Sequence, residues 1–218
     1  MTADRKTAVY TRVMDSDPRT TGAQGPIQVL FVQGGGTGAY DEDALLAGSL
    51  RDNLGPAFQV RYPEMVEEDE PDVGTWGRQI DREIDTMTGD VIVVGHSIGA
   101  SVILKHLSEG DDSRGRRIRG IFLLATPSWG ADDFWSWEEC TLDPAATARL
   151  TERVPVALYH AVDDEAVPYS HLDRNRGLVP GARFHEIPAG GHQFDNDLGF
   201  LADDIRRLIE GVSGPIAG

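Results

Sequence analysis

The stretch from Asp90 to Ser101, DVIVVGHSIGAS, constrains the fold of this chain more than any other. Its first half is apolar at four successive positions, as in a strand that is buried on both faces of a parallel sheet. Its second half passes through two glycines into a segment whose apolar residues have helical spacing. A strand that turns directly into a helix predicts a parallel sheet covered by helices.

The rest of the chain repeats this alternation of short apolar runs and longer amphipathic ones. The predicted strands are residues 27–33, 58–62, 90–95, 120–125, 156–162 and 183–187. Two predicted helices carry apolar faces, which are formed by Val73, Trp76, Ile80, Ile84 and Met87 and by Leu201, Ile205, Leu208, Ile209 and Val212. We therefore expect an α/β fold with a mostly parallel central sheet flanked by helices.

The length of the chain fits one domain. With 218 residues, 40% of them hydrophobic, it is long enough to bury a sizeable core, and we expect a single domain over residues 26–218. Residues 1–25 are polar and rich in turn-forming residues, which is typical of a short edge strand or a loose tail.

Charge and residue usage limit the partners. A formal net charge of −16 repels nucleic-acid phosphates, so we expect no nucleic acid as a partner. The acidic run from Glu67 to Asp72 lacks the ligand spacing of a calcium loop and is predicted to be a solvated surface. One cysteine and the absence of an HExxH pattern also predict no metal site.

The N-terminal sequence indicates where the protein acts. It alternates charged residues where a signal peptide would be apolar. Nowhere does the chain contain about 18 consecutive apolar residues, the length needed for a membrane span. We therefore expect a soluble, cytoplasmic protein.

The sequence GHSIG around Ser97 fits the pattern GxSxG at a turn from strand to helix. Glycines on both sides allow the backbone to bend sharply and lift the serine hydroxyl above the sheet. The following helix directs its free N–H groups and partial positive charge toward anything bound there. Ser97 is therefore a candidate nucleophile, which needs a base and an acid to orient that base.

Both groups are available downstream. Asp163 and Asp164 follow the predicted strand 156–162, and His192 follows the predicted strand 183–187. The carboxyl ends of parallel strands meet at one edge of a sheet, where open α/β proteins assemble their sites. The sequence therefore predicts that His192 and one of the two aspartates lie beside Ser97.

The segments GHSIG at 95–99, HAVDDEAVP at 160–168 and GGH at 190–192 resemble the α/β-hydrolase family, and the resemblance extends from residue 26 to the C-terminal helix. It implies a small serine hydrolase or esterase that needs no cofactor, with Ser97 as nucleophile and His192 as base. The family pattern places the acid at Asp164, with Asp163 as the runner-up. Gln33 departs from the pattern, because many relatives have histidine before the glycines.

The resemblance also implies an oxyanion hole. One N–H comes from the loop after an early strand and the other from the residue after the nucleophile, which here are Gly35 and Ile98. Gly34, Gly36 and His96 would lie on the substrate side, His96 packing beside the turn. Glycine suits this loop because the substrate must contact its backbone.

A dinucleotide-binding oxidoreductase is a rival prediction. Residues 34–39 read GGGTGA and satisfy the GxGxxG/A fingerprint directly after a predicted strand. The acid expected on the ribose is Glu64, about thirty residues on, where about twenty is usual. Three acidic residues at 41–43 would also repel a pyrophosphate.

Three of the four tryptophans lie between residues 129 and 137, after the predicted strand 120–125. We expect residues 127–142 to form a short cap in which Trp129 and Trp135 contact the acyl group of a small-molecule ester. Ordinary packing of the rings under a loop is the alternative. A further alternative is a non-catalytic protein of this fold that binds a small molecule or a partner. The sequence specifies neither the ester nor the oligomeric state.

Overall fold

The computed structural model describes residues 25–110, 117–130 and 133–211, so the N-terminal segment 1–24 lies outside it. Its centre is a six-stranded sheet in the order β2-β1-β3-β4-β5-β6, in which all neighbouring strands are parallel. The strands are β1 Ile27–Val32, β2 Phe58–Arg61, β3 Val91–His96, β4 Ile118–Leu124, β5 Val156–Ala161 and β6 Arg183–Ile187. The predicted parallel α/β architecture is confirmed.

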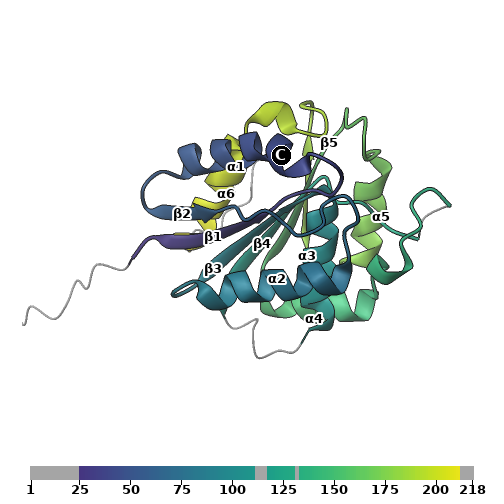
Figure 1. Cartoon of the computed structure of the whole chain (residues 1–218), viewed down its shortest axis with the longest axis horizontal. Helices are drawn as coiled ribbons and strands as arrows, with labels where there is room; N and C mark the ends of the chain where they lie inside the picture. The colour runs from purple at the N-terminus through teal and green to yellow at the C-terminus, as the bar shows by residue number, and fades with distance from the viewer. Residues whose placement is uncertain (1–24, 111–116, 131–132, 212–218) are drawn as a thin grey trace, which may run out of the picture.

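Helices cover both faces of the sheet (Figure 1). The α-helices are α1 Ala39–Leu54, α2 Val73–Thr86, α3 Ser97–Glu109, α4 Pro144–Arg153, α5 Ser170–Leu178 and α6 Gly199–Ile209, with 3₁₀ turns η2 Glu138–Cys140 and η3 Phe194–Asn196. Helices α1 and α6 pack together on one face, and α2, α3 and α4 line the other. Helix α5 packs beside α4.

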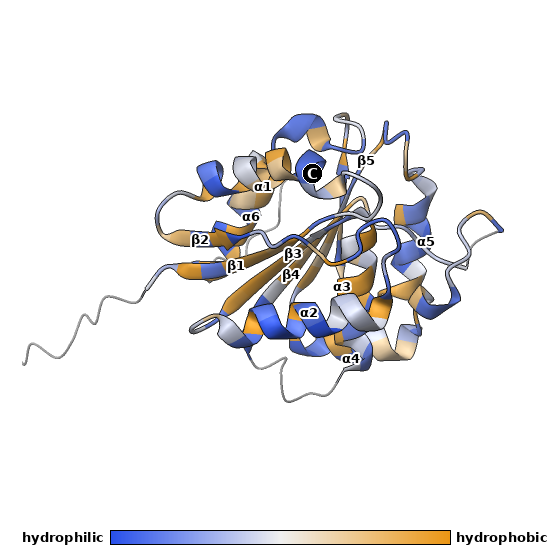
Figure 2. Ribbon diagram, in the orientation of Figure 1, coloured by the Kyte–Doolittle hydropathy of each residue, from blue (hydrophilic) through white to orange (hydrophobic). Residues whose placement is uncertain are grey.

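Two apolar clusters explain why the strands are hydrophobic on both faces. Trp76 and Ile80 of α2 are fully buried in the cluster beneath α2, α3 and α4. Leu201 and Ile205 of α6 are fully buried in the cluster beneath α1 and α6. Figure 2 shows the strands mostly in the hydrophobic colour, between helices that mix hydrophilic and hydrophobic residues. The two helical faces expected from the sequence are present, although Val212 lies outside the described residues.

The strand order determines where a site can form. The chain passes from β1 outward to β2 and then returns to β3 on the other side of β1. Loops after β1 and β3 therefore diverge and leave a crevice at the carboxyl edge of the sheet. Helix α3 packs closely here, because a Cβ at Gly99 would lie 2.1 Å from the backbone oxygen of Gln33. The fold thereby holds the start of α3 against the loop after β1.

Candidate active site

Ser97 stands at the turn between β3 and α3 with a φ of 50°, in the left-handed region that residues with side chains rarely adopt. The turn needs both flanking glycines. A Cβ at Gly95 would lie 2.5 Å from the Cδ1 atom of Ile103, and Gly99 is closed by the β1 loop. The GxSxG sequence thus produces a strained turn with the serine at its apex.

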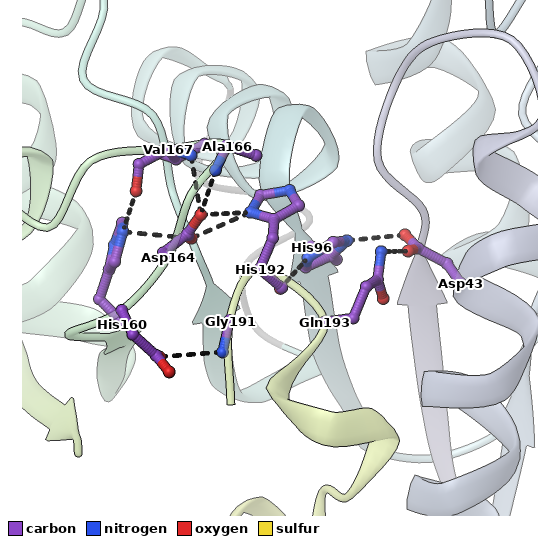
Figure 3. Close-up of polar contacts among 10 residues, drawn as sticks. Asp43, His96, His160, Asp164, Ala166, Val167, Gly191, His192 and Gln193 are labelled. Atoms are coloured by element: carbon purple, nitrogen blue, oxygen red, sulfur yellow. Dashed lines mark hydrogen bonds and ion pairs between the residues drawn. The ribbon is translucent and has the colours of Figure 1, made fainter. Parts of the chain in front are cut away.

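His192 and Asp164 are in contact, as Figure 3 shows. The Nδ1 atom of His192 lies 2.9 Å from Oδ2 of Asp164 and 3.1 Å from Oδ1. Oδ1 also accepts hydrogen bonds from the backbone N–H groups of Ala166 at 2.9 Å and Val167 at 2.8 Å. This carboxylate is therefore fixed by the backbone on one side and faces the imidazole on the other.

The environment of Asp164 favours its charged form. Only 8% of the residue is exposed. Burial acts to raise the pKa of Asp164, but the hydrogen bond and charge of His192, together with the Val167 N–H, outweigh it and leave the pKa below its usual value. A charged Asp164 holds a proton on Nδ1 of His192, which leaves Nε2 as the basic nitrogen.

Asp163, the runner-up acid in the sequence prediction, has different contacts. It is exposed, and its two carboxylate oxygens accept hydrogen bonds from Gly191 N at 2.9 Å and Gly190 N at 3.3 Å. These glycines immediately precede His192. Asp163 thus anchors the backbone of the histidine loop, whereas Asp164 contacts the imidazole.

His160 lies behind Asp164 and is fully buried. Its Nε2 atom is 2.8 Å from the backbone oxygen of Val167 and 3.4 Å from Oδ2 of Asp164. Burial lowers the pKa of His160, so the neutral ring donates its single proton to Val167. His160 supports the loop that holds Asp164.

The glycine loop after β1 presents an unused N–H group at Gly35. Gly34 donates to the Asp43 carboxylate at 2.7 Å, and Gly36 donates to the backbone oxygen of Glu68 at 2.6 Å. Between them, the Gly35 N–H has no acceptor among the described residues. The N–H of Ile98 lies in the first turn of α3, where helical donors have no partner within the helix. The two residues are adjacent, since a Cβ at Gly35 would lie 2.9 Å from Cδ1 of Ile98.

Glu68 occupies the position that a phosphate would need in the dinucleotide prediction. Its carboxylate accepts hydrogen bonds from the N–H groups of Gly38 and Tyr40, at the start of α1, both at 2.8 Å. It also accepts from the side chain of Gln33 at 2.7 Å, and Gln33 in turn accepts from Met65 N at 2.9 Å. The helix N-terminus is already occupied by a negative charge of the protein itself, which argues against a bound pyrophosphate.

Most of the candidate residues line a cleft of about 300 Å³, and Asp164 lies behind it in contact with His192. Among its lining residues are Ser97, His192, Gly35, Ile98, Gly34, His96, Trp129, Trp135, Pro127 and Val167. Gly36, predicted to face the substrate, does not line this cleft because it is turned toward Glu68. A larger groove of about 880 Å³ lies between β6 and α6 and contains none of these residues.

The tryptophans of the predicted cap form an aromatic cluster at the cleft. The ring centroid of Trp129 lies 5.5 Å from that of Trp135 and 5.3 Å from that of Trp137. Trp135 also packs edge-on against His171, with centroids 4.5 Å apart. Residues 131 and 132 of this segment lie outside the described part.

His96 has no free ring nitrogen for a substrate. It is 1% exposed, with Nδ1 2.8 Å from Oδ2 of Asp43 and Nε2 3.1 Å from the backbone oxygen of His192. The side chain of Gln193 donates to the other oxygen of Asp43 at 3.0 Å. The sequence interpretation missed Asp43, Glu68 and Gln193, because no local pattern marks polar residues that meet only in three dimensions.

Within the described ranges, no three His, Cys, Asp or Glu side chains are grouped so as to hold a metal ion. No helix in those ranges combines the length and apolar character needed to cross a membrane.

Comparison with known proteins gives one family. Residues 47–203 match the sequence model of a family described as serine hydrolase. Compared with the curated proteins by sequence, the chain matches none.

Solved structures with the same fold include serine hydrolases. A serine hydrolase from Cycloclasticus zankles is 12% identical with a TM-score of 0.65, over 87% of this chain and 91% of that one. The ydeN gene product of B. subtilis is 20% identical with a TM-score of 0.59, over 84% and 99%. The 2-hydroxy-6-oxo-6-phenylhexa-2,4-dienoate hydrolase of Rhodococcus sp. strain RHA1 is 15% identical with a TM-score of 0.64, over 84% and 89%.

Proposed function

The chain belongs to the serine hydrolase family and has the α/β-hydrolase fold, and on that premise we propose that it cleaves carboxylic esters or related acyl bonds through an acyl-serine intermediate. The observation that carries the proposal is the contact between His192 and Asp164, 2.9 Å apart, since His192 lines the same cleft as Ser97. A strained serine and an imidazole oriented by a carboxylate at the same cleft support the assignment of Ser97 as nucleophile, His192 as base and Asp164 as acid.

In the first step, the Ser97 hydroxyl attacks the acyl carbon while Nε2 of His192 takes its proton. Asp164 keeps the other imidazole proton on Nδ1 and stabilises the imidazolium that forms. His192 then gives the proton to the departing alcohol, leaving the acyl group on Ser97. The bond from the Ser97 oxygen to the acyl carbon forms, and the bond from that carbon to the alcohol oxygen breaks. The proton taken from Ser97 leaves with the alcohol.

The tetrahedral oxyanion receives two hydrogen bonds, from the N–H groups of Gly35 and Ile98. Both donors are fixed before substrate binds, because Gly34 and Gly36 are hydrogen-bonded on either side of Gly35 and Ile98 lies in a helix. A fixed donor of this kind contributes about 3 kcal/mol to transition-state stabilisation. In the second step, water activated by His192 releases the acid and restores Ser97.

The cleft favours a small, uncharged acyl group. Its volume of about 300 Å³ is at the lower end of the range for small-molecule sites. Its lining combines the aromatic rings of Trp129 and Trp135 with the acidic residues Glu42 and Asp43. The rings suit an apolar chain, and the Glu42 carboxylate disfavours a substrate with a negative charge.

Labelling with a fluorophosphonate probe tests the proposal. We expect a single covalent adduct on Ser97 in the folded protein, lost in Ser97→Ala and retained in the control Ser108→Ala. The control changes a serine of the same helix whose hydroxyl donates to the backbone oxygen of Lys105. Hydrolysis of short p-nitrophenyl esters should be lost in the same variant. Folded protein that is not labelled would support a non-catalytic binder, and NAD binding without labelling would support the dinucleotide prediction.

A further inference from the structure

We propose that Asp43 and His96 form a buried carboxylate–imidazolium pair that positions the oxyanion loop and the His192 loop against the turn at Ser97. Neither residue belongs to the Ser97–His192–Asp164 set. The inference rests on the proposed function for its effect on catalysis, whereas the charge state of the pair does not depend on it.

The hydrogen-bond partners of His96 require two ring protons. Nδ1 faces a carboxylate oxygen of Asp43 at 2.8 Å, and Nε2 faces the backbone oxygen of His192 at 3.1 Å. Both partners only accept hydrogen bonds when Asp43 is ionised. A neutral imidazole has one N–H and would direct a lone pair at one of the two oxygens. The doubly protonated ring satisfies both contacts.

The surroundings of the pair support this charge state. Asp43 and His96 are each 1% exposed, so neither is hydrated. Burial acts to lower the pKa of His96, but the charge and hydrogen bond of Asp43 outweigh it and the pKa lies above its ordinary value. Burial acts to raise the pKa of Asp43, but the charge of His96 and the hydrogen bonds to the carboxylate leave that pKa below its ordinary value.

Asp43, in α1, connects two loops that are far apart in the sequence, and Gln193 in the second of them lies 150 residues after Asp43. One carboxylate oxygen accepts from the N–H of Gly34, the residue before Gly35, at 2.7 Å. The other accepts from the side chain of Gln193, the residue after His192, at 3.0 Å. Figure 3 shows His96 between Asp43 and His192, with the side chain of Gln193 directed toward Asp43. The carboxylate therefore holds both the oxyanion loop and the histidine loop.

The histidine loop needs this attachment because its backbone begins with two glycines, at φ 135° for Gly190 and φ 60° for Gly191. Asp163 holds that side of the loop through the two glycine N–H groups. The pair holds the other side through the carbonyl of His192 and the side chain of Gln193. With Asp164 on the ring itself, His192 is restrained at three places.

The charged groups that face His96 are few. Asp43 from α1 supplies the opposite charge, and the ring of His192 packs against that of His96 with centroids 4.6 Å apart at 49°. Asp164, beyond His192, adds a weaker attraction. Loss of the Asp43 charge leaves His96 neutral and releases one of its two contacts. A displaced His192 loop lowers the chemical rate more than substrate binding, because the reacting geometry is formed by the loop.

The charge state is measured directly by ¹⁵N NMR of histidine-labelled protein at pH 7, with the His96 signals assigned by their loss in His96→Asn. In the wild type we expect both ring nitrogens of His96 to carry a proton. In Asp43→Asn, whose side chain has nearly the same shape, we expect one protonated and one bare nitrogen. A neutral His96 in the wild type would overturn the proposal, with or without enzymatic activity.

The effect on the site is measured by the rate of fluorophosphonate labelling and by kcat and KM for a short ester. We expect Asp43→Asn to lower the labelling rate and kcat by roughly 10- to 100-fold with little change in KM. The matched control is Asp81→Asn. The Asp81 carboxylate, on α2, lies 3.0 Å from Nε2 of His106 on α3, and neither residue lines the cleft. This control should stay within about twofold of the wild type.

If Asp43→Asn does not fold, Gln193→Ala removes only one hydrogen bond of the pair and should slow labelling roughly two- to tenfold. The positioning role would be refuted if the folded Asp43→Asn protein had the labelling rate and kcat of the wild type. Where Gln193→Ala replaces that variant, the same result in Gln193→Ala would refute it. A wild type that is never labelled would instead refute the proposed function, and the NMR result would still report on the pair.

Discussion

Replacing Asp164 by asparagine tests whether this residue sets the proton position on His192. Oδ1 of Asp164 accepts from two backbone N–H groups, of Ala166 and Val167. An asparagine must keep its oxygen on that side, because its amide hydrogens would meet two donors. The amide nitrogen then takes the place of Oδ2, 2.9 Å from Nδ1 of His192.

The amide N–H donates a hydrogen bond, so it needs a lone pair on Nδ1. It therefore favours the imidazole tautomer whose proton is on Nε2. That nitrogen then lacks the lone pair that the Ser97 hydroxyl needs. We expect kcat to fall roughly 10³- to 10⁴-fold, equivalent to about 4–5 kcal/mol of activation free energy. The assay is steady-state hydrolysis of a short p-nitrophenyl ester, with thermal unfolding to show that the variant is folded.

The neighbouring Asp163→Asn variant is the matched control. In the wild type, Asp163 accepts from the Gly191 N–H at 2.9 Å and from the Gly190 N–H at 3.3 Å. The asparagine keeps one acceptor oxygen for Gly191 and loses at most the hydrogen bond to Gly190. Because Asp163 is exposed, water replaces the lost acceptor, and activity should fall by less than about tenfold. A larger loss in Asp163→Asn than in Asp164→Asn would refute this reasoning and assign the acid to Asp163.

Two further predictions concern the cap and the pH range. Trp135→Ala removes a ring that lines the cleft and should shift the preference among p-nitrophenyl esters toward longer acyl chains; the same chain-length profile as the wild type would favour ordinary packing of the ring. Asp164 has a lowered pKa when folded, so its stabilising contribution is complete above the unfolded value of about 3.9 and is lost as pH falls through the folded value. Urea unfolding of the wild type and Asp164→Asn should therefore give free energies that converge as the solution becomes more acidic than about pH 4, and a gap that widens there would contradict the ionised state of Asp164.

Some of this protein could be read from local sequence. Strands buried on both faces, helices with one apolar face, and glycines flanking Ser97 are patterns that each segment carries by itself. They predicted the parallel sheet and the strand-to-helix turn at Ser97. Because parallel strands bring their carboxyl ends to one edge, they also predicted that His192 and an aspartate follow strands at that edge.

Only the tertiary structure decided which polar side chains meet. Glu68 lies in an acidic run that looks like a solvated surface, yet its carboxylate holds the start of α1 and Gln33. Asp43 was one of three adjacent acids, yet it is buried against His96 and bonded to Gln193. Hydrogen bonds between distant segments leave no period in the sequence, because they depend on how strands and loops are arranged around one another. The order of the strands in the sheet therefore decided which polar side chains meet, because the hydrophobic pattern of the sequence does not specify these contacts.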